Sequence, residues 1–162
     1  MKEMRPTTGR VLLALFNILG PLKEKSFLDL FSGSGQIAME ASKRGATLVY
    51  SVESDKKRYA ELVRRVPKDV KCLCMDVRRA VPRFSKRMEK FDIIFADPPY
   101  GLDWGLELPS IIGNNGSILS DEGIFIYEHS DKEKICELDL NNWSRDDRVY
   151  GGTILSFYKR RN

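Results

Sequence analysis

The residues of this chain with the clearest chemical potential follow one apolar run, and they are Asp97, Pro98, Pro99 and Tyr100. An amine on a planar base has two N–H donors, and the Asp97 carboxylate and the Pro98 carbonyl each accept one. Both prolines fix φ and offer no competing donor, while the ring of Tyr100 offers a face for base stacking. These residues predict a catalytic tip for a substrate amine, although a rigid surface turn uses the same residue types.

Three more acidic residues, Asp29, Glu53 and Asp76, stand at or near the ends of apolar runs. The runs cover residues 26–31, 47–52, 70–75 and 91–96, and helical patterns separate them. Such alternation requires parallel strands, whose carboxyl ends meet at one edge of a sheet. A single acid after a strand is common in turns, but four at one edge predict a ligand crevice.

The remaining elements complete an α/β fold. We expect a first helix over 11–19 capped by Thr7 or Thr8, a helix closing at Gly45, a helix over 59–66 capped by Ser54, and a weaker one over 77–84 that Pro82 breaks or restarts. Trp104 to Ile112 has helical spacing, with Pro109 confining the helix, and 123–128 is a fifth strand. A hairpin of 143–150 and 153–158 turns at Gly151-Gly152, where both glycines supply positive φ. We therefore predict a mostly parallel seven-stranded sheet with an antiparallel C-terminal hairpin and helices on both faces.

Composition fits a single globular domain over residues 1–162. The chain is 42% apolar and 31% charged, and no apolar run approaches the length of a membrane helix. The polar start shows no signal peptide, so a cytoplasmic protein is expected. Cys72, Cys74 and Cys136 match neither a zinc spacing nor a disulfide set, which predicts reduced, mostly core thiols and no metal site.

The positive residues are bunched, although the formal net charge is only +4. Each cluster alone is explained by a solvated helix face, but together they predict a polyanionic partner. The clusters are Lys56-Lys57-Arg58, Arg64-Arg65, Arg78-Arg79, Arg83 with Lys86-Arg87, and Lys159-Arg160-Arg161.

The glycine turn after the first strand, from Gly33 to Ala38, satisfies the G-x-G-x-x-A pattern, so a nicotinamide dinucleotide site is one reading. Asp29 argues against it, because its charge lies where an anionic pyrophosphate would approach. No residues suited to hydride chemistry stand beside the strand ends, and His129 is the only histidine. A cofactor that carries an ammonium and a sulfonium group fits Asp29 better.

With the glycine turn and the tip both placed, the sequence resembles S-adenosylmethionine-dependent amino-methyltransferases. It is most similar to the bacterial 16S ribosomal RNA guanine-N2 methyltransferase family. The resemblance spans nearly the whole chain and also rests on Arg5-Pro6-Thr7-Thr8 with Arg10, Leu15-Phe16-Asn17, Tyr127-Glu128-His129-Ser130, and Tyr150-Gly151-Gly152-Thr153 with Phe157-Tyr158.

The resemblance implies a Rossmann-like class I methyltransferase fold that binds S-adenosyl-L-methionine. It implies that Thr8 and Asn17 lie at the methionine end of the cofactor. The sites that it implies for the rest of the cofactor are Asp29, Phe31, Ser32, Gly33 and Gly35 around the methionine part, Glu53 with Ser54 at the ribose, Asp76 with Val77 at the adenine, and Asp97 beside the tip.

The implied reaction is methylation of the exocyclic N2 amine of a guanine in 16S ribosomal RNA. The implied partner is ribosomal RNA or the small ribosomal subunit, with no membrane, and the protein is expected to be a monomer. Two alternatives remain open. Adenine-N6 methylation of DNA or RNA shares the chemistry of the tip, and a non-catalytic RNA-binding or ribosome-assembly factor would keep the cofactor fold as a vestige.

Overall fold

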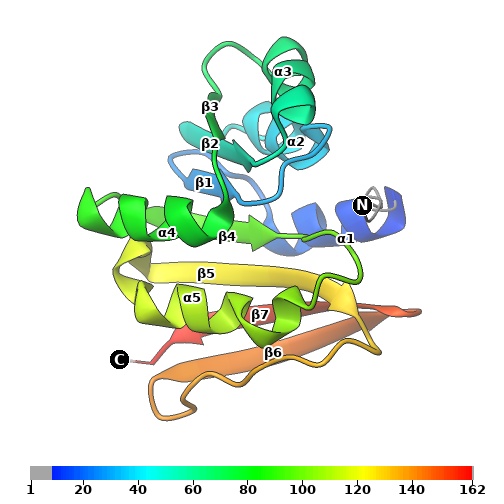
Figure 1. Ribbon diagram of the computed structural model, residues 1–162, viewed down its shortest axis with the longest axis vertical. Helices are drawn as coiled ribbons and strands as arrows, with labels where there is room; N and C mark the ends of the chain where they lie inside the picture. Colours follow the sequence, from blue (N-terminus) through cyan, green and yellow to red (C-terminus); the bar gives the residue numbers. More distant parts are fainter. Residues whose placement is uncertain (1–8, 162) are drawn as a thin grey trace.

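A seven-stranded sheet forms the centre of the protein (Figure 1). A computed structural model describes residues 9–161. The strands are β1 (Ser26–Asp29), β2 (Leu48–Glu53), β3 (Lys71–Cys74), β4 (Phe91–Ala96), β5 (Leu119–Ser130), β6 (Trp143–Tyr150) and β7 (Thr153–Arg160). Their order is β3-β2-β1-β4-β5-β7-β6, parallel from β3 to β5 and antiparallel in the last two pairings. The predicted fold class, including the C-terminal hairpin, is confirmed.

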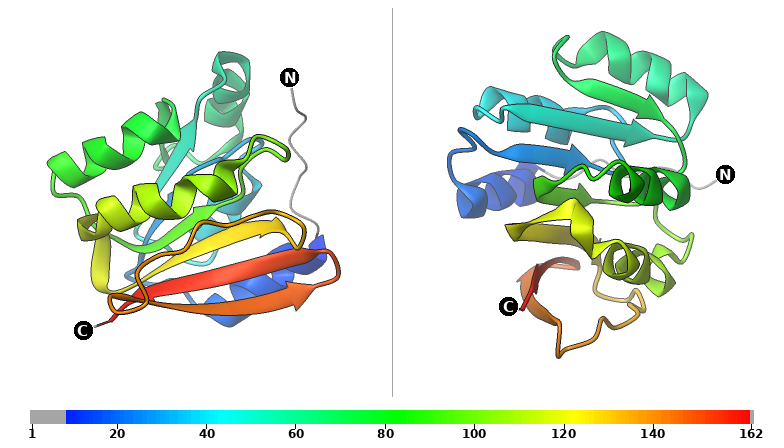
Figure 2. Two further views of the ribbon diagram at one scale, coloured as in Figure 1. Left: turned by 60° about the horizontal axis from the view of Figure 1, so that its bottom comes forward. Right: turned by 90° about the vertical axis from the view of Figure 1, so that its left-hand side faces the viewer.

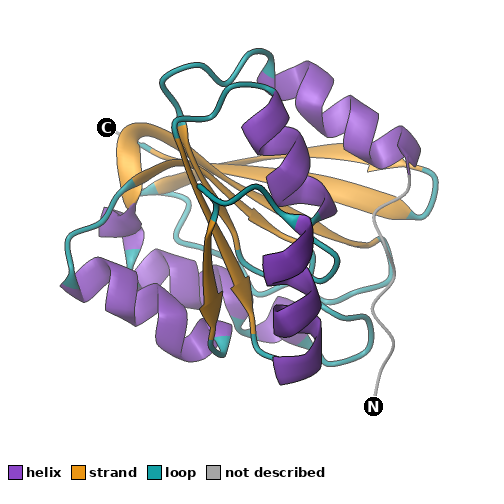
Figure 3. Ribbon diagram, turned by 90° about the horizontal axis from the view of Figure 1, so that it is seen from above, coloured by secondary structure: helices purple, strands orange, loops and turns teal. Residues whose placement is uncertain are grey.

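Helices cover both faces of the sheet (Figures 2 and 3). One face carries α1 (Gly9–Leu19), α2 (Gln36–Lys43) and α3 (Lys56–Arg65), and the other carries α4 (Val77–Lys86) and α5 (Leu108–Asn114). The short 3₁₀ helices η1 (Trp104–Leu106) and η2 (Gly116–Ile118) flank α5. Within residues 9–161, no helix is long and apolar enough to cross a membrane.

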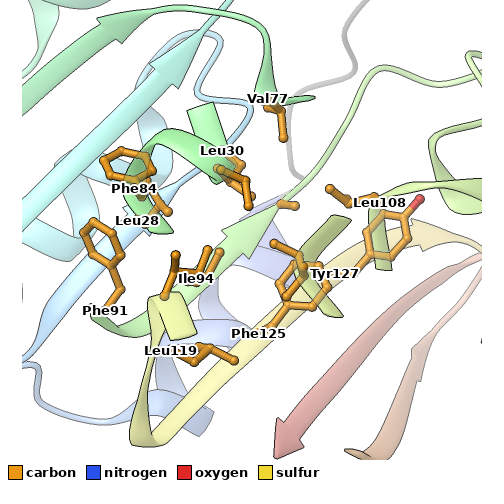
Figure 4. Close-up of a cluster of buried hydrophobic side chains, with 14 of the residues drawn as sticks. Leu28, Leu30, Val77, Phe84, Phe91, Ile94, Leu108, Leu119, Phe125 and Tyr127 are labelled. Atoms are coloured by element: carbon orange, nitrogen blue, oxygen red, sulfur yellow. The ribbon is translucent and has the colours of Figure 1, made fainter. Parts of the chain in front are cut away.

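The strands bury alternate residues against the two helical layers, as a period of two requires. Leu28 of β1 and Ile94 of β4 face α4 and α5, whereas the preceding Phe27 and Ile93 face the layer of α1, α2 and α3. Figure 4 shows the first of these two cores, where side chains of β1, β4, β5, α4 and α5 meet. Because both faces are covered, the parallel strands are nearly continuous apolar runs.

Pro82 does not break α4, contrary to the sequence-based expectation. The helix continues from Val77 to Lys86 with Pro82 inside it. Pro82 lies on the exposed side, while Val77, Ala80, Val81 and Phe84 are buried. A proline in a helix costs about 3 kcal/mol, and burying the larger of these side chains contributes about 1.5–3 kcal/mol each, so burial outweighs the lost hydrogen bond.

Two smaller expectations were also wrong. The cysteines were expected to be mostly core residues, but none is buried: Cys72 and Cys136 are half-buried and Cys74 is exposed. β3 is an edge strand, and none of its residues is fully buried.

At the hairpin turn only Gly151 has positive φ, at 61°, so one left-handed residue suffices there.

Gly105, in η1, is where the structure leaves no room for a side chain. A Cβ at this position would overlap the backbone carbonyl oxygen of Lys134. The backbone of Gly105 also donates to Glu133 Oε1 at 3.1 Å and accepts from the amide of Cys136 at 2.7 Å. The segment after β5 is therefore fitted directly against η1.

We expect Gly105→Ala to lower the free energy of unfolding by about 1–3 kcal/mol, because the backbone at Lys134 must move. Denaturant unfolding measures this. Gly152→Ala is the matched control, since a Cβ at Gly152 meets nothing within 4 Å. Equal stabilities of the two variants would contradict the close approach.

Candidate active site

The predicted convergence of acids at one edge of the sheet is confirmed by the strand order. β3, β2, β1 and β4 are neighbours and parallel, so Asp76, Glu53, Asp29 and Asp97 lie in that order along their carboxyl ends. The charges of Asp97 and Glu53 both act on Asp29. Residues far apart in the sequence thus form one acidic edge.

In the described part of the site, the Asp29 carboxylate is buried without a hydrogen bond to offset the loss of water. Its side chain is 1% exposed, and neither carboxylate oxygen has a hydrogen-bond partner among residues 9–161. The Ser32 hydroxyl donates to the carbonyl oxygen of Asp29 at 3.2 Å. Burial raises the pKa of Asp29 to about 7, the Ser32 hydroxyl moderates this rise, and the charges of Asp97 and Glu53 add to it. A buried carboxylate of this kind is suited to a cationic ligand group.

Glu53 joins the glycine turn to the start of α3. Its Oε1 accepts from the amide of Gly33 and its Oε2 from the amide of Asp55, both at 2.9 Å. Each carboxylate oxygen keeps a second lone pair, so further donors such as hydroxyls can still bind. Glu53 therefore positions two loops of the site and remains able to contact a ligand.

The glycine turn has the geometry that its sequence requires. Gly33 and Gly35 have φ of 52° and 84°. A Cβ on Gly35 would lie 2.8 Å from Leu62 Cδ1 and 2.9 Å from Val66 Cγ1. The absence of a side chain at Gly35 therefore allows the start of α2 to approach α3, and this keeps the turn against the end of β1.

A pocket of about 310 Å³ lies at the ends of β1, β2 and β3. Five residues that sequence reasoning assigned to the cofactor line it: Phe31, Glu53, Ser54, Asp76 and Val77. Ser54 does not cap α3, because Asp55 does so by accepting from the amide of Arg58 at 2.9 Å. Sequence reasoning assigned no site role to six further lining residues, which are Leu30, Val52, Arg58, Arg78, Leu102 and Trp104.

Arg78 connects this pocket to the segment that follows the tip. Its guanidinium lies 4.0 Å from the centre of the Trp104 ring and forms a fork with Glu107 at 2.6 and 3.0 Å. It also bonds the Asp76 carboxylate at 3.2 Å, and Trp104 meets the ring of Phe31 edge-on at 4.9 Å. These contacts join residues that precede the tip in the chain to residues that follow it, and together they hold the wall of the pocket in place. In the sequence, Arg78 was marked by its position two residues after Asp76 and by its place in the basic cluster Arg78-Arg79.

The tip separates two cavities. Pro99 lines the larger pocket, whereas Asp97, Pro98 and Tyr100 line a smaller one of about 30 Å³. Glu128, His129, Ser130, Glu133 and Thr153 complete the smaller cavity. Tyr100 is 56% exposed. A group held at the tip would thus lie between the cofactor-sized pocket and solvent.

Two predicted residues are not part of this arrangement as the structure describes it. Thr8 lies outside the described residues. Asn17 is exposed, and it follows Phe16, whose carbonyl oxygen accepts from Arg44 at 3.5 Å. Arg44 ends α2 at the amino edge of the sheet, so Asn17 is not brought to the acidic edge. The helical spacing of residues 11–19 gave no information on which end of the sheet α1 approaches.

Comparisons with known proteins agree with this geometry. The model of a family described as conserved hypothetical protein 95 matches residues 1–159. The chain is 30% identical over 167 residues to YlbH of Bacillus subtilis (strain 168), provisionally named an rRNA methyltransferase, covering 97% of this chain and 88% of the relative. It is also 30% identical over 160 residues to Ribosomal RNA small subunit methyltransferase D of Escherichia coli (strain K12), covering 97% and 80%.

Solved structures share the fold. A provisionally named methyltransferase of Escherichia coli, yhhF, superimposes with a TM-score of 0.81 at 24% identity, covering 99% of this chain and 90% of that one. A hypothetical protein of Thermus thermophilus gives 0.80 at 26% identity, covering 98% and 92%. The sheet and its helices are therefore those of a known group of structures.

The burial of Asp29 makes stability depend on pH. Between about pH 4 and pH 7 the folded protein keeps a proton at Asp29 that the unfolded chain has lost, so the free energy of unfolding falls as pH rises through this range. Asp29→Asn removes the titration. We expect the stability of this variant, relative to the wild type, to rise by about 3 kcal/mol between about pH 5 and about pH 8.

Denaturant unfolding of the ligand-free proteins at both pH values tests this expectation. Asp121→Asn, at an exposed position in β5, is the control and should follow the wild type. Parallel pH profiles for the wild type and Asp29→Asn would show that the Asp29 carboxylate is not held out of water.

Proposed function

Because this chain belongs to the family described as conserved hypothetical protein 95, and is 30% identical to a small-subunit ribosomal RNA methyltransferase, we propose that it methylates the N2 amine of a guanine in 16S ribosomal RNA. The methyl donor in this proposal is S-adenosyl-L-methionine. The observation that carries it is the buried carboxylate of Asp29, which has no hydrogen-bond partner in the described part of the chain, beside a tip suited to hold an amine. We further propose that a single domain, 1–162, acts as a cytoplasmic monomer on ribosomal RNA, free or within the small subunit.

The described residues suit this cofactor. Asp29 offers a buried negative charge to its ammonium and sulfonium groups, and Glu53 has lone pairs left for the ribose hydroxyls. The adenine end of the pocket has apolar walls, to which Val77 and Trp104 contribute, beside the Asp76 carboxylate. Phe31, Ser32, Gly33, Gly35 and Ser54 would contact the rest of the cofactor. When bound, S-adenosyl-L-methionine supplies a methyl group on a positively charged sulfur, so no metal ion is required.

The chain itself contributes positioning. The Asp97 carboxylate and the Pro98 carbonyl accept the two N–H groups of the target amine, which turns its lone pair toward the cofactor pocket. Pro98 and Pro99 fix the backbone before the substrate arrives, and Pro99 also forms part of the pocket wall. Tyr100, more than half exposed, stacks on the base and shields the reacting groups from water.

Removal of the Asp97 carboxylate should impair methyl transfer without impairing the binding of the cofactor. We expect Asp97→Ala to lower methyl transfer by about 100-fold or more, because the amine loses an acceptor that orients it. Its affinity for S-adenosyl-L-methionine should stay within about threefold of wild type, since the cofactor keeps most of its contacts. The assay measures methyl transfer to small ribosomal subunits from Escherichia coli cells that lack methyltransferase D.

Asp121→Ala is the control for this experiment, and normal turnover by Asp97→Ala would remove the role given to Asp97. Product analysis decides between the enzyme readings. N2-methylguanine supports the proposal, N6-methyladenine would replace it with adenine methylation, and no methylated product would leave the non-catalytic RNA-binding reading.

Cofactor affinity should depend on pH through Asp29. A cationic ligand binds the ionised carboxylate, whose pKa in the ligand-free protein is about 7. Below about pH 7 the affinity should therefore fall by up to about tenfold per pH unit, and above it should level off. Calorimetric titration with S-adenosyl-L-methionine measures this dependence. Asp29→Asn should bind weakly at every pH, and an unchanged profile in that variant would contradict an ionic contact at Asp29.

A further inference from the structure

The outer face of α4 carries charge that no contact within residues 9–161 explains. Arg79, Arg83 and Lys86 are exposed and have spacings of four and three residues, so they share one side of the helix, opposite the buried face. In the described structure none of them forms an ion pair or a side-chain hydrogen bond. We call these three residues the α4 ridge.

The charges of the α4 ridge repel one another. Like charges at i,i+3 and i,i+4 repel each other, and such helix pairs destabilise a helix. Some other charges of the described chain are paired, as in Glu40 with Arg44 on α2 and Arg145 with Asp147 on β6, whereas the basic residues of α3 form no ion pair within residues 9–161. On α4 no acidic residue is present to balance the basic ones. The ridge thus has no acidic residue on its own helix, whereas Glu61 lies among the basic residues of α3.

The charge of α4 is also large for this protein. Its ten residues include four basic and no acidic side chains, a formal charge of +4, and α3, with five basic residues and one acidic residue, carries the same formal charge. Arg78, the first of the four, already forms hydrogen bonds with Glu107 and Asp76 and a cation–π contact with the Trp104 ring. The ridge residues are therefore the ones available to an external anion.

The ridge starts at the candidate site. Asp76 caps α4 by accepting from the amide of Arg78 at 2.8 Å, and Asp76, Val77 and Arg78 line the pocket. Arg79 is the next residue, and Lys86 follows about 10 Å farther along the helix. The helix leads from β3 back to the start of β4, so the ridge extends from the acidic edge across the outer surface (Figure 1).

We propose that the α4 ridge binds the phosphate backbone of the RNA whose base enters the tip at residues 97–100. This rests on the proposed function. Guanidinium and ammonium groups on one helix face match a polyanion, and between them lies Pro82 rather than a large apolar side chain, which disfavours a membrane surface or an apolar peptide. The ridge supplies sequence-independent affinity, while the acidic edge, which would repel phosphates, receives only the base.

The test compares two triple variants with equal loss of charge. The ridge variant is Arg79→Gln, Arg83→Gln and Lys86→Gln. The control is Arg64→Gln, Arg65→Gln and Lys68→Gln, three exposed positions in and just after α3, on the other side of the sheet. Affinity for naked Escherichia coli 16S ribosomal RNA is measured over a range of salt concentrations. Affinity for S-adenosyl-L-methionine and the midpoint of denaturant unfolding show that each variant is folded.

We expect the ridge variant to bind the RNA about tenfold or more weaker, with a salt slope smaller by about 2, and to keep its cofactor affinity and its stability. The control should stay close to wild type. Equal weakening of both variants would show a general effect of net charge and would overturn the proposal, as would unchanged binding by the ridge variant. Weaker binding to anionic lipid vesicles alone would identify a membrane instead.

The two proposals fail separately. If the wild-type protein methylates no RNA, the proposed function falls, but the RNA-binding comparison still decides the ridge. If the wild-type protein methylates small ribosomal subunits and the ridge variant does so with the same KM and salt dependence, the ridge proposal falls and the proposed function stands.

Discussion

The carboxylate of Asp29 lies at the end of β1, out of reach of water and without a hydrogen-bond donor among the described residues. Burying such a group costs free energy, and here the structure reduces that cost by favouring the protonated form. Asp97 and Glu53, on the neighbouring strands, increase the cost through their own charges. The glycine turn, the acidic edge and the pocket are arranged around a charge that a bound cation would compensate.

The parallel direction of the strands and the convergence of their acidic ends were predictable from the sequence, because both follow from alternating periodicities and a fixed handedness of connection. Alternative roles for neighbouring residues were harder to predict. Ser54 and Asp55 are adjacent cap residues, and only the structure shows that the Asp55 carboxylate reaches the amide of Arg58. Pro82 is a helix breaker by propensity, yet the apolar face of α4 overrides it.

Side-chain contacts across the sheet edge were not predictable, because neither partner marks the other in the sequence. Arg78 and Glu107 are 29 residues apart, and their contact depends on how η1 folds back after the tip. The same holds for Asn17, since helical spacing predicts α1 but not its direction relative to the strand ends. The sequence thus indicated which residues belong to the site, and tertiary packing determined where each of them lies and which residues it contacts.

The strands at the middle of the sheet come from distant parts of the chain. β1 pairs with β2 nearby in sequence, but its other partner is β4, and Asp92 of β4 bonds both the amide of Ser26 at 2.9 Å and the Ser120 hydroxyl at 2.8 Å. During synthesis, β1 therefore has an unpaired edge until residues beyond 96 have emerged. Such an edge is a template for pairing with other chains, and non-local strand pairing is slow to form. The acidic edge is thus completed only after β4 has docked against β1.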